Sequence, residues 1–162
     1  MSLYWIDHPA GHRLAIMARP RAGDWLEDEI ARWRNAGVDL VVSLLESEEV
    51  ADLELQREAM LCRAAGIDFV SFPIPDRGVP PSFTETRTLT EMIGMRGGEH
   101  AVAIHCRAGI GRSALIAGMV LVLAGMSTAD ALDAIGRARG LIVPDTDAQI
   151  EWLRRFEHSR SA

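Results

Sequence analysis

Residues 105–113, with the sequence HCRAGIGRS, place a cysteine, two glycines and an arginine within one short stretch. The apolar run 101–104 before them is typical of a buried strand, and the apolar run 114–123 after them is typical of a buried helix. At such a junction the first N–H groups of the helix lack partners and the helix dipole is positive, so a phosphate-sized anion binds there. The stretch therefore predicts a phosphate-binding loop (P-loop) with a nucleophile in its floor.

The cysteine and the arginine supply the chemistry of this loop. The thiolate form of a cysteine is the nucleophile, and a helix N-terminus, amide donors and a nearby cation all favour that form. Cys106 has all three within reach, because Arg112 lies at the closing end of the loop. The planar guanidinium of Arg112 can hold two phosphoryl oxygens at once and keeps its charge. We therefore expect Cys106 to be the nucleophile and Arg112 to hold the phosphate.

The remaining loop residues have supporting roles. Gly109 and Gly111 allow a positive φ and a close approach of the backbone to the ligand. Ser113 can donate a hydrogen bond towards the sulfur and ease its departure, and His105 can orient Cys106 without acid–base work. The alternative, a small buried cysteine beside a glycine turn, leaves an unpaired arginine at the positive end of an apolar helix. The expected phosphate-binding residues are Arg107, Ala108, Gly109, Ile110, Gly111 and Arg112.

This stretch resembles the His-Cys-x5-Arg-Ser/Thr signature of the cysteine-dependent protein tyrosine and dual-specificity phosphatases. Such a reaction needs an acid to protonate the leaving oxygen, and the family supplies it from a Trp-Pro-Asp-x-Gly-Val-Pro loop ahead of the signature. Residues 74–80, IPDRGVP, match every fixed position except the first, where Ile74 replaces tryptophan. Asp76 precedes Cys106 by 30 residues, which resembles the compact dual-specificity branch. The resemblance makes Asp76 the general acid; the alternative is a surface turn.

A third segment carries a weaker resemblance. Gln149 is similar to the glutamine with which some relatives position the hydrolytic water. The alternative is a solvated residue in the first turn of a helix that Asp145 or Thr146 caps. Arg137 and Arg139 either line the mouth of the pocket or face solvent.

The second cysteine, Cys62, is expected to be a packed small residue of the core. The alternative is a resolving thiol that forms a disulfide with oxidised Cys106. Two cysteines and five histidines do not form a metal-ligand set. We therefore expect neither a metal nor another cofactor.

Strands and helices alternate along the chain. The predicted strands cover residues 14–18, 38–44, 67–72 and 101–104, with an earlier one near Trp5, and the predicted helices cover 24–33, 47–65, 83–95, 114–123, 128–139 and 147–158. This order predicts an α/β fold with a mainly parallel central sheet flanked by helices on both faces, and the resemblance makes it dual-specificity phosphatase-like. Ligands of such sheets bind beyond the carboxyl ends of the strands, so the loops of Asp76 and Cys106 should share one pocket.

Composition narrows the function further. A chain of 162 residues that is 48% hydrophobic predicts a single phosphatase catalytic domain over residues 1–162. The net charge of −6 argues against a nucleic-acid partner, and the absence of lysine excludes a Walker-type nucleotide loop. The N-terminal residues do not resemble a signal peptide, and the apolar run 114–124 is about half the ~20 residues of a membrane span. A cytoplasmic location without a membrane span is expected.

The expected activity is phosphomonoester hydrolysis through a cysteinyl-phosphate intermediate. The expected substrate is a phosphorylated protein or peptide, with phosphotyrosine first. A phosphoinositide or a small phosphorylated metabolite is the alternative, although tensin-type lipid phosphatases favour extra basic residues in the loop, where this chain has Arg107 but the neutral Ile110. A non-catalytic phospho-binding domain is less expected, and a sulfurtransferase or arsenate reductase has no need for the Asp76 segment. The sequence leaves the oligomeric state open.

Overall fold

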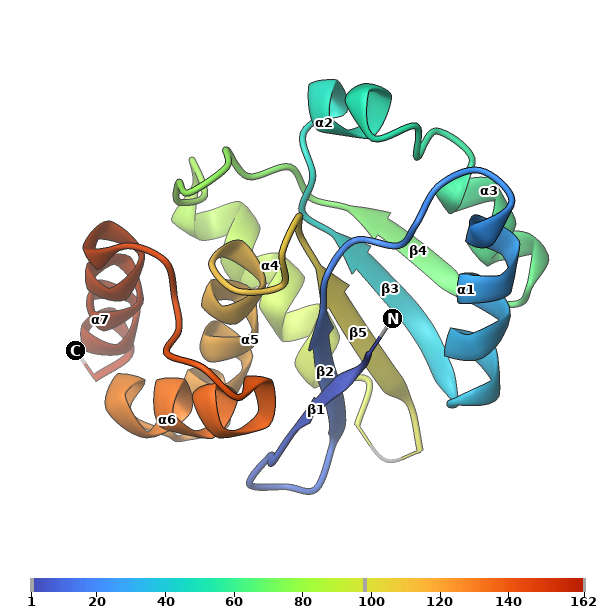
Figure 1. Ribbon diagram of the computed structural model, residues 1–162. Helices are drawn as coiled ribbons and strands as arrows, with labels where there is room; N and C mark the ends of the chain where they lie inside the picture. Colours follow the sequence, from blue (N-terminus) through green and yellow to red (C-terminus); the bar gives the residue numbers. More distant parts are fainter. Residues whose placement is uncertain (1, 98, 162) are drawn as a thin grey trace.

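A five-stranded mixed sheet lies at the centre of the computed structural model, which describes residues 2–97 and 99–161 (Figure 1). The strand order is β1-β2-β5-β3-β4, and only β1 runs antiparallel to its neighbour. This arrangement confirms the mainly parallel sheet that the alternating pattern predicts. The strands are β1 (Tyr4–Ile6), β2 (Arg13–Met17), β3 (Val38–Ser43), β4 (Asp68–Ser71) and β5 (Ala101–His105).

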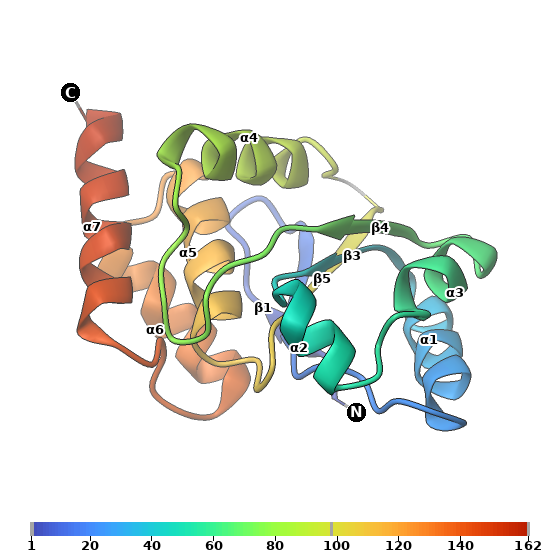
Figure 2. The same cartoon turned by 90° about the horizontal axis from the view of Figure 1, so that it is seen from above.

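Helices cover both faces of this sheet. Two of them, α1 and α3, lie against one face, while α4 and α5 lie against the other with α6 and α7 outside them (Figures 1 and 2). In the described part of the chain no helix is both long enough and apolar enough to cross a membrane. The helices are α1 (Trp25–Asn35), α2 (Ser47–Asp52), α3 (Glu58–Ala64), α4 (Phe83–Gly94), α5 (Arg112–Leu123), α6 (Thr128–Arg139) and α7 (Asp147–Ser161).

The central helix α5 is buried on all sides. Every residue of α5 from Arg112 to Val122 is buried, because the sheet packs on one side of it and α4, α6 and α7 pack on the others. A helix that is apolar all round is stable only in such a place. Burial of α5 therefore fixes the position of its N-terminus, where the candidate P-loop ends.

Side chains of the central strand β5 alternate between the two faces of the sheet. Val102 and Ile104 pack in the core cluster on the α4 and α5 side, and Ala103 packs in the cluster on the α1 and α3 side. Because successive side chains of a strand point to opposite faces, His105 faces α1 and α3, whereas Cys106 belongs to the α5 side.

The prediction of one helix over residues 47–65 is wrong. The chain forms α2 and α3 there, and α2 ends where Glu54 adopts a left-handed φ of 56°. The backbone N–H of Leu55 then donates to the carbonyl of Val50 (2.9 Å), and the side chain of Leu55 is buried. Burial of this leucine accounts for the turn, because the gain on burying such a side chain exceeds the cost of an αL residue. The break places α2 above the carboxyl ends of the strands (Figure 1).

Backbone hydrogen bonds continue past the strand ends and fix the loops that follow. The N–H of Leu44 donates to the carbonyl of His105 (2.9 Å), and the N–H of Ile74 donates to the carbonyl of Leu44 (3.0 Å). These bonds hold the segments after β3, β4 and β5 side by side. The loops that carry Asp76 and Cys106 therefore start from one common edge, as expected for a parallel sheet.

Candidate active site

The P-loop, residues 106–111, is held from outside by its carbonyl groups. The N–H of Arg19 donates to the carbonyl of Arg107 (3.1 Å), and the guanidinium of Arg139 donates to the carbonyls of Ala108 (3.2 Å) and Gly109 (3.1 Å). In a trans peptide the N–H points away from the C=O. The N–H groups of residues 108–110 therefore face the inside of the loop, where a phosphate would lie.

Gly109 is required by the path of this loop. Its φ is +72°, a region that side chains rarely adopt, and a Cβ atom there would lie 2.5 Å from the carbonyl carbon of Met17. The loop thus packs directly on the end of β2. The positive φ expected of Gly109 is present, whereas Gly111 has a φ of −83° and has to lack a side chain because the Asp145 carboxylate lies against it.

Arg139 contributes to this loop in a way that the sequence did not predict. Neither alternative, pocket mouth or solvent, describes it, because it binds the outside of the loop and stacks over the ring of Tyr4 at 4.3 Å. Arg137 lies on the exposed surface of α6, where it pairs with Asp133. Arg139 therefore links α6, β1 and the loop.

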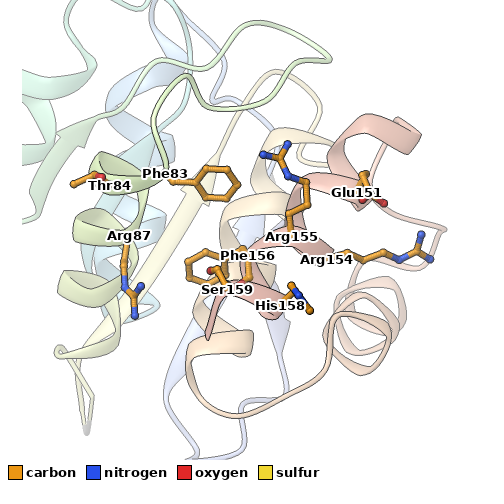
Figure 3. Close-up of a pocket in the computed structure, with 9 residues that line it drawn as sticks. All are labelled: Phe83, Thr84, Arg87, Glu151, Arg154, Arg155, Phe156, His158 and Ser159. Atoms are coloured by element: carbon orange, nitrogen blue, oxygen red, sulfur yellow. Dashed lines mark hydrogen bonds between the residues drawn. The ribbon is translucent and has the colours of Figure 1, made fainter. Parts of the chain in front are cut away.

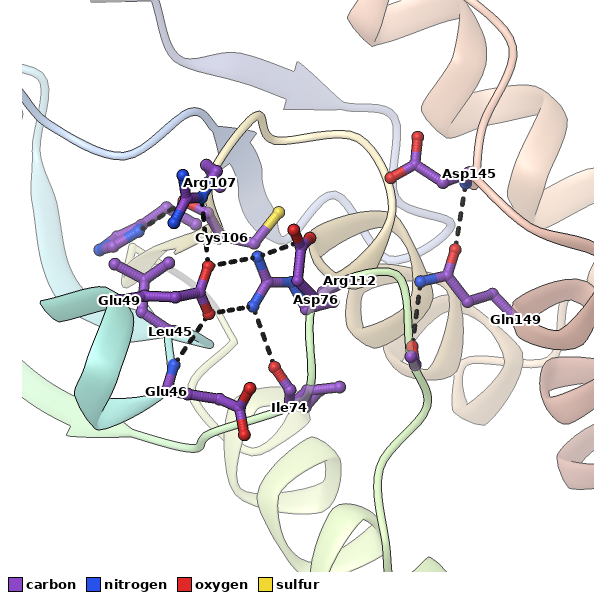
Figure 4. Close-up of polar contacts among 12 residues, drawn as sticks. Leu45, Glu46, Glu49, Ile74, Asp76, Cys106, Arg107, Arg112, Asp145 and Gln149 are labelled. Carbon is purple, nitrogen blue, oxygen red and sulfur yellow. Dashed lines mark hydrogen bonds and ion pairs between the residues drawn. The ribbon is translucent and has the colours of Figure 1, made fainter. Parts of the chain in front are cut away.

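Arg112 is a buried cation surrounded by acceptors (Figure 4). Its Nη1 donates to Glu49 Oε1 (2.6 Å) and to the carbonyl of Ile74 (2.9 Å), while Nη2 donates to Glu49 Oε2 (3.0 Å) and Asp76 Oδ1 (3.1 Å). Burial lowers the pKa of Arg112, but the hydrogen bonds to Glu49 and the negative charges of Cys106, Glu49 and Asp76 outweigh burial and raise the pKa. The guanidinium therefore stays charged and fixed in direction.

Glu49 is a site residue that the sequence analysis missed. It sits in the first turn of α2 and also accepts hydrogen bonds from the N–H of Glu46 (3.1 Å) and from Arg107 Nε (3.3 Å). Burial raises the pKa of Glu49, but its contacts with Arg112, Glu46 and Arg107 outweigh burial and lower it. The signal in the sequence was an acidic run, residues 46, 48 and 49, after a buried strand, and nothing in that run indicates which glutamate faces inward.

Asp76 lies over the loop, as Figure 4 shows, with its carboxylate against Arg112 and near Cys106. Its side chain is 56% exposed, so it remains accessible to substrate and water. The loop turns just after it, where Arg77 has a φ of 59° and the N–H of Gly78 donates to the carbonyl of Pro75 (2.8 Å). Ile74, which replaces the tryptophan of the family pattern, is fully buried and anchors the loop. The structure thus brings together Cys106, Arg112 and Asp76.

Gln149 connects α7 to the Asp76 loop. Its Oε1 accepts from the N–H groups of Asp145 (3.1 Å) and Thr146 (3.2 Å), and its Nε2 donates to the carbonyl of Gly78 (3.0 Å). The side chain is fully buried, which contradicts the solvated alternative. Through these contacts Gln149 links the segment before α7 to the Asp76 loop. Its role in placing water stays a prediction.

Ser113 and His105 flank the loop on its two sides. The buried Oγ of Ser113 has no hydrogen-bond partner within residues 2–97 and 99–161, and an unsatisfied buried hydroxyl costs about 1–3 kcal/mol. The predicted hydrogen bond from Ser113 to the Cys106 sulfur is therefore not formed in this structure and stays a prediction for the reaction. His105 Nδ1 lies 3.2 Å from the carbonyl oxygen of Cys106, consistent with the predicted orienting role.

Cys62 lies in α3 and packs in the core cluster on the α1 and α3 side, whereas Cys106 belongs to the cluster on the other face. Burial, with the nearby charge of Glu58, raises the pKa of Cys62 to about 12. A thiol of this pKa carries almost no thiolate at neutral pH. The structure therefore favours a packed core residue over a resolving thiol.

A groove of about 730 Å³ lies apart from this site, between α4 and α7 (Figure 3). Its walls include Phe83 and Phe156, and the guanidinium of Arg155 lies 5.3 Å from the ring of Phe83. None of the predicted site residues lines it. We therefore assign the chemistry to the P-loop and not to this groove.

Glu49→Gln removes the charge that balances Arg112 while keeping the shape of the side chain. We expect the free energy of unfolding at pH 7, measured by urea denaturation, to fall by roughly 1–3 kcal/mol, because a buried charge loses its counter-charge. The pKa of Glu49 is lower in the folded chain than its ordinary value of 4.5. Its contribution is therefore present above that pH and lost as the pH falls through the folded pKa, so the difference between the two proteins should shrink in acid.

The control for this variant is Glu48→Gln, which changes the exposed neighbour in the same helical turn. A surface change of this kind should alter stability by less than about 0.5 kcal/mol. Equal effects of the two substitutions would contradict the account of the Arg112 contacts.

Comparison with curated proteins finds no match. Comparisons with solved structures and with family models do find similar proteins, and these agree with the geometry of the site. Among solved structures, the kinase associated phosphatase KAP, with its catalytic-site cysteine replaced by serine, has a TM-score of 0.88 at 20% identity over 100% of this chain and 97% of its own. PTPMT1 has a TM-score of 0.78 at 22% identity, over 99% of this chain and 96% of its own. These two likenesses show the fold.

The active form of Tk-PTP is similar at 29% identity, with a TM-score of 0.76 and coverage of 97% of each chain. A family model described as "Polymorphic toxin system, DSP-PTPase phosphatase" matches residues 15–126, which is more than half of the chain. The chain therefore belongs to this DSP-PTPase phosphatase family, within the superfamily of cysteine-dependent tyrosine and dual-specificity phosphatases.

Proposed function

We propose that this phosphatase removes phosphate from proteins or peptides, phosphotyrosine first, through a cysteinyl-phosphate intermediate, and that residues 1–162 act as a single catalytic domain. The observation that carries the proposal is the meeting of three groups at one edge of the sheet. Cys106 lies at the floor of a loop with inward N–H groups, Arg112 lies at its end, and Asp76 contacts Arg112 from above. A nucleophile, an anion holder and an acid are the parts that such a reaction needs.

Arg112 is arranged so that one edge of its guanidinium can take a phosphate. Glu49 accepts from both terminal nitrogens, and Ile74 accepts the second hydrogen of Nη1. The Nε–H and the Nη2–H that now bonds Asp76 form the side edge of the fork. Two phosphoryl oxygens would bind that edge in place of the Asp76 carboxylate, while Glu49 keeps the fork in the same orientation.

Phosphate bound to Arg112 would displace the Asp76 carboxylate, which takes up a proton from solvent and can then act as the general acid. The Cys106 thiolate attacks phosphorus, the bond from phosphorus to the ester oxygen breaks, and Asp76 gives its proton to that oxygen. Water then attacks the cysteinyl-phosphate, and Asp76 takes a proton from it. The sulfur leaves as a thiolate to which Ser113 donates a hydrogen bond, and Gln149 is our candidate for placing the water.

Protein phosphotyrosine is our first substrate class because the loop itself carries little unbalanced positive charge. Arg107, its one basic residue ahead of Arg112, is half exposed and bonds Glu49 through Nε (3.3 Å). Ile110 is neutral and packs against the core. A polyanionic substrate would gain from free cations there. The alternative, a phosphoinositide or small phosphorylated metabolite, is supported by the similar structure of PTPMT1 in complex with PI(5)P.

Replacing the nucleophile should abolish turnover. Cys106→Ser should leave no measurable hydrolysis of p-nitrophenyl phosphate, since a serine hydroxyl at this position has no base to activate it. Quenched reactions of the unmodified protein should show one phosphoryl group on Cys106 by mass spectrometry. The matched control, Cys62→Ala, changes the other buried cysteine and should retain turnover. Hydrolysis that persists in Cys106→Ser would refute the mechanism.

Removing the acid should have an effect that depends on the leaving group. For Asp76→Asn we expect kcat to fall by roughly 100-fold to 10,000-fold with phenyl phosphate, and much less with aryl phosphates whose leaving groups are strongly acidic. The comparison variant is Asp145→Asn, because the Asp145 carboxylate also lies beside the loop at Gly111. If the leaving-group dependence appeared in Asp145→Asn and not in Asp76→Asn, Asp145 would be the acid and our assignment of Asp76 would be wrong.

A further inference from the structure

A buried pair of charged side chains lies behind the P-loop, on the face of the sheet opposite Cys106. His105 Nε2 and Glu58 Oε2 are 2.6 Å apart, and the two side chains are 0% and 2% exposed. Glu58 is the first residue of α3, and the ring of His105 also contacts the ring of Trp33, with centroids 6.5 Å apart. The reaction steps above do not use Glu58.

Both nitrogens of His105 face hydrogen-bond acceptors. Nε2 faces the Glu58 carboxylate, and Nδ1 faces the backbone carbonyl of Cys106 at 3.2 Å. A neutral imidazole has one N–H and can serve one acceptor, whereas an imidazolium has two and serves both. The geometry therefore fits an imidazolium paired with a carboxylate, a combination whose net charge is zero.

The electrostatic surroundings agree with this assignment. Burial lowers the pKa of His105, but the charge of Glu58 and the hydrogen bonds to Glu58 and Cys106 outweigh burial and raise it. Arg112 lies near enough to lower that pKa. Glu58 also lies near Cys62, and burial together with the Glu58 charge raises the pKa of that thiol to about 12, so Cys62 stays neutral at physiological pH. Glu58 is thus the group that keeps the ring charged.

The hydrogen bond from Nδ1 has a consequence for the phosphate site. Because the carbonyl of Cys106 is held towards His105, the N–H of Arg107 in the same peptide points the other way, into the loop. Arg19 and Arg139 hold the next three carbonyls in the same manner. His105 therefore provides the first in a series of outside contacts that turn the amides of residues 107–110 inward.

We propose that Glu58 is a positioning residue for the phosphate site. It keeps His105 in the imidazolium form, and His105 holds the Cys106 carbonyl so that the Arg107 amide and the Cys106 sulfur face the phosphate. This inference rests on the proposed function. Glu58 touches neither substrate nor sulfur and acts only through His105.

Two measurements test this role without using turnover. Nitrogen-15 NMR of the histidine rings should show hydrogen on both nitrogens of His105 at pH 7 in the unmodified chain, and on one nitrogen in Glu58→Gln. Alkylation of Cys106 by iodoacetamide, followed against pH in a Cys62→Ala background, should shift its midpoint upward by about one pH unit in Glu58→Gln. The glutamine keeps the size of the side chain and removes only the charge.

The matched control is Glu29→Gln, which removes another buried carboxylate, one that pairs with Arg21 at 2.8 Å. It should leave the alkylation midpoint unchanged. In Glu58→Gln we also expect kcat/KM for p-nitrophenyl phosphate to fall by roughly 10-fold to 100-fold.

The proposal is overturned if the unmodified His105 carries hydrogen on only one ring nitrogen at pH 7. It is equally overturned if Glu58→Gln and Glu29→Gln have the same alkylation midpoint. The NMR measurement needs no variant, so a folding defect in Glu58→Gln leaves it decisive. Failure of the proposed function would appear differently, as turnover that persists in Cys106→Ser.

Discussion

The buried guanidinium of Arg112 is the constraint on which the rest of the site depends. A cation that is 2% exposed must be balanced by nearby negative charge and hydrogen-bond acceptors or it destabilises the fold. Glu49 comes from α2 after β3, and the Ile74 carbonyl and Asp76 come from the loop after β4. Arg112, at the start of α5 after β5, therefore contacts the segments that follow the neighbouring strands β3 and β4. The arrangement that balances this charge also places Asp76, the proposed acid, over Cys106, the proposed nucleophile.

Contacts from outside the P-loop set the shape of that loop. His105, Arg19 and Arg139 bind successive carbonyls of the P-loop, so the amides face inward without help from a ligand. Donors that are oriented in advance cost no reorganisation when charge develops on the phosphate. The three contacts come from β5, the segment after β2, and α6. The preformed site is thus a property of the whole fold and not of the nine signature residues alone.

Local sequence patterns predicted much of this architecture, but they did not predict the contacts between residues that are far apart in the sequence. The strand, loop and helix around Cys106 followed from apolar runs and a fixed spacing, and Asp76 followed from a second motif. Glu49 and Glu58 were missed because they meet Arg112 and His105 across 63 and 47 residues of sequence. The predicted helix 47–65 had no breaker residue, and burial of Leu55 decided its interruption. Gln149 was found by resemblance, but its bonds to Asp145, Thr146 and Gly78 depend on loop packing that no local pattern records.

We propose that the inward amides and the edge of Arg112 that Asp76 now occupies form one site for a phosphoryl group in line with the Cys106 sulfur. A crystal structure with orthovanadate tests this most directly. We predict vanadium bonded to Cys106 Sγ, with equatorial oxygens on Nε and Nη2 of Arg112, Glu49 still paired with that arginine, and Asp76 moved to the apical oxygen. Vanadate bound away from Cys106, or bound to an Arg112 that has released Glu49, would contradict it.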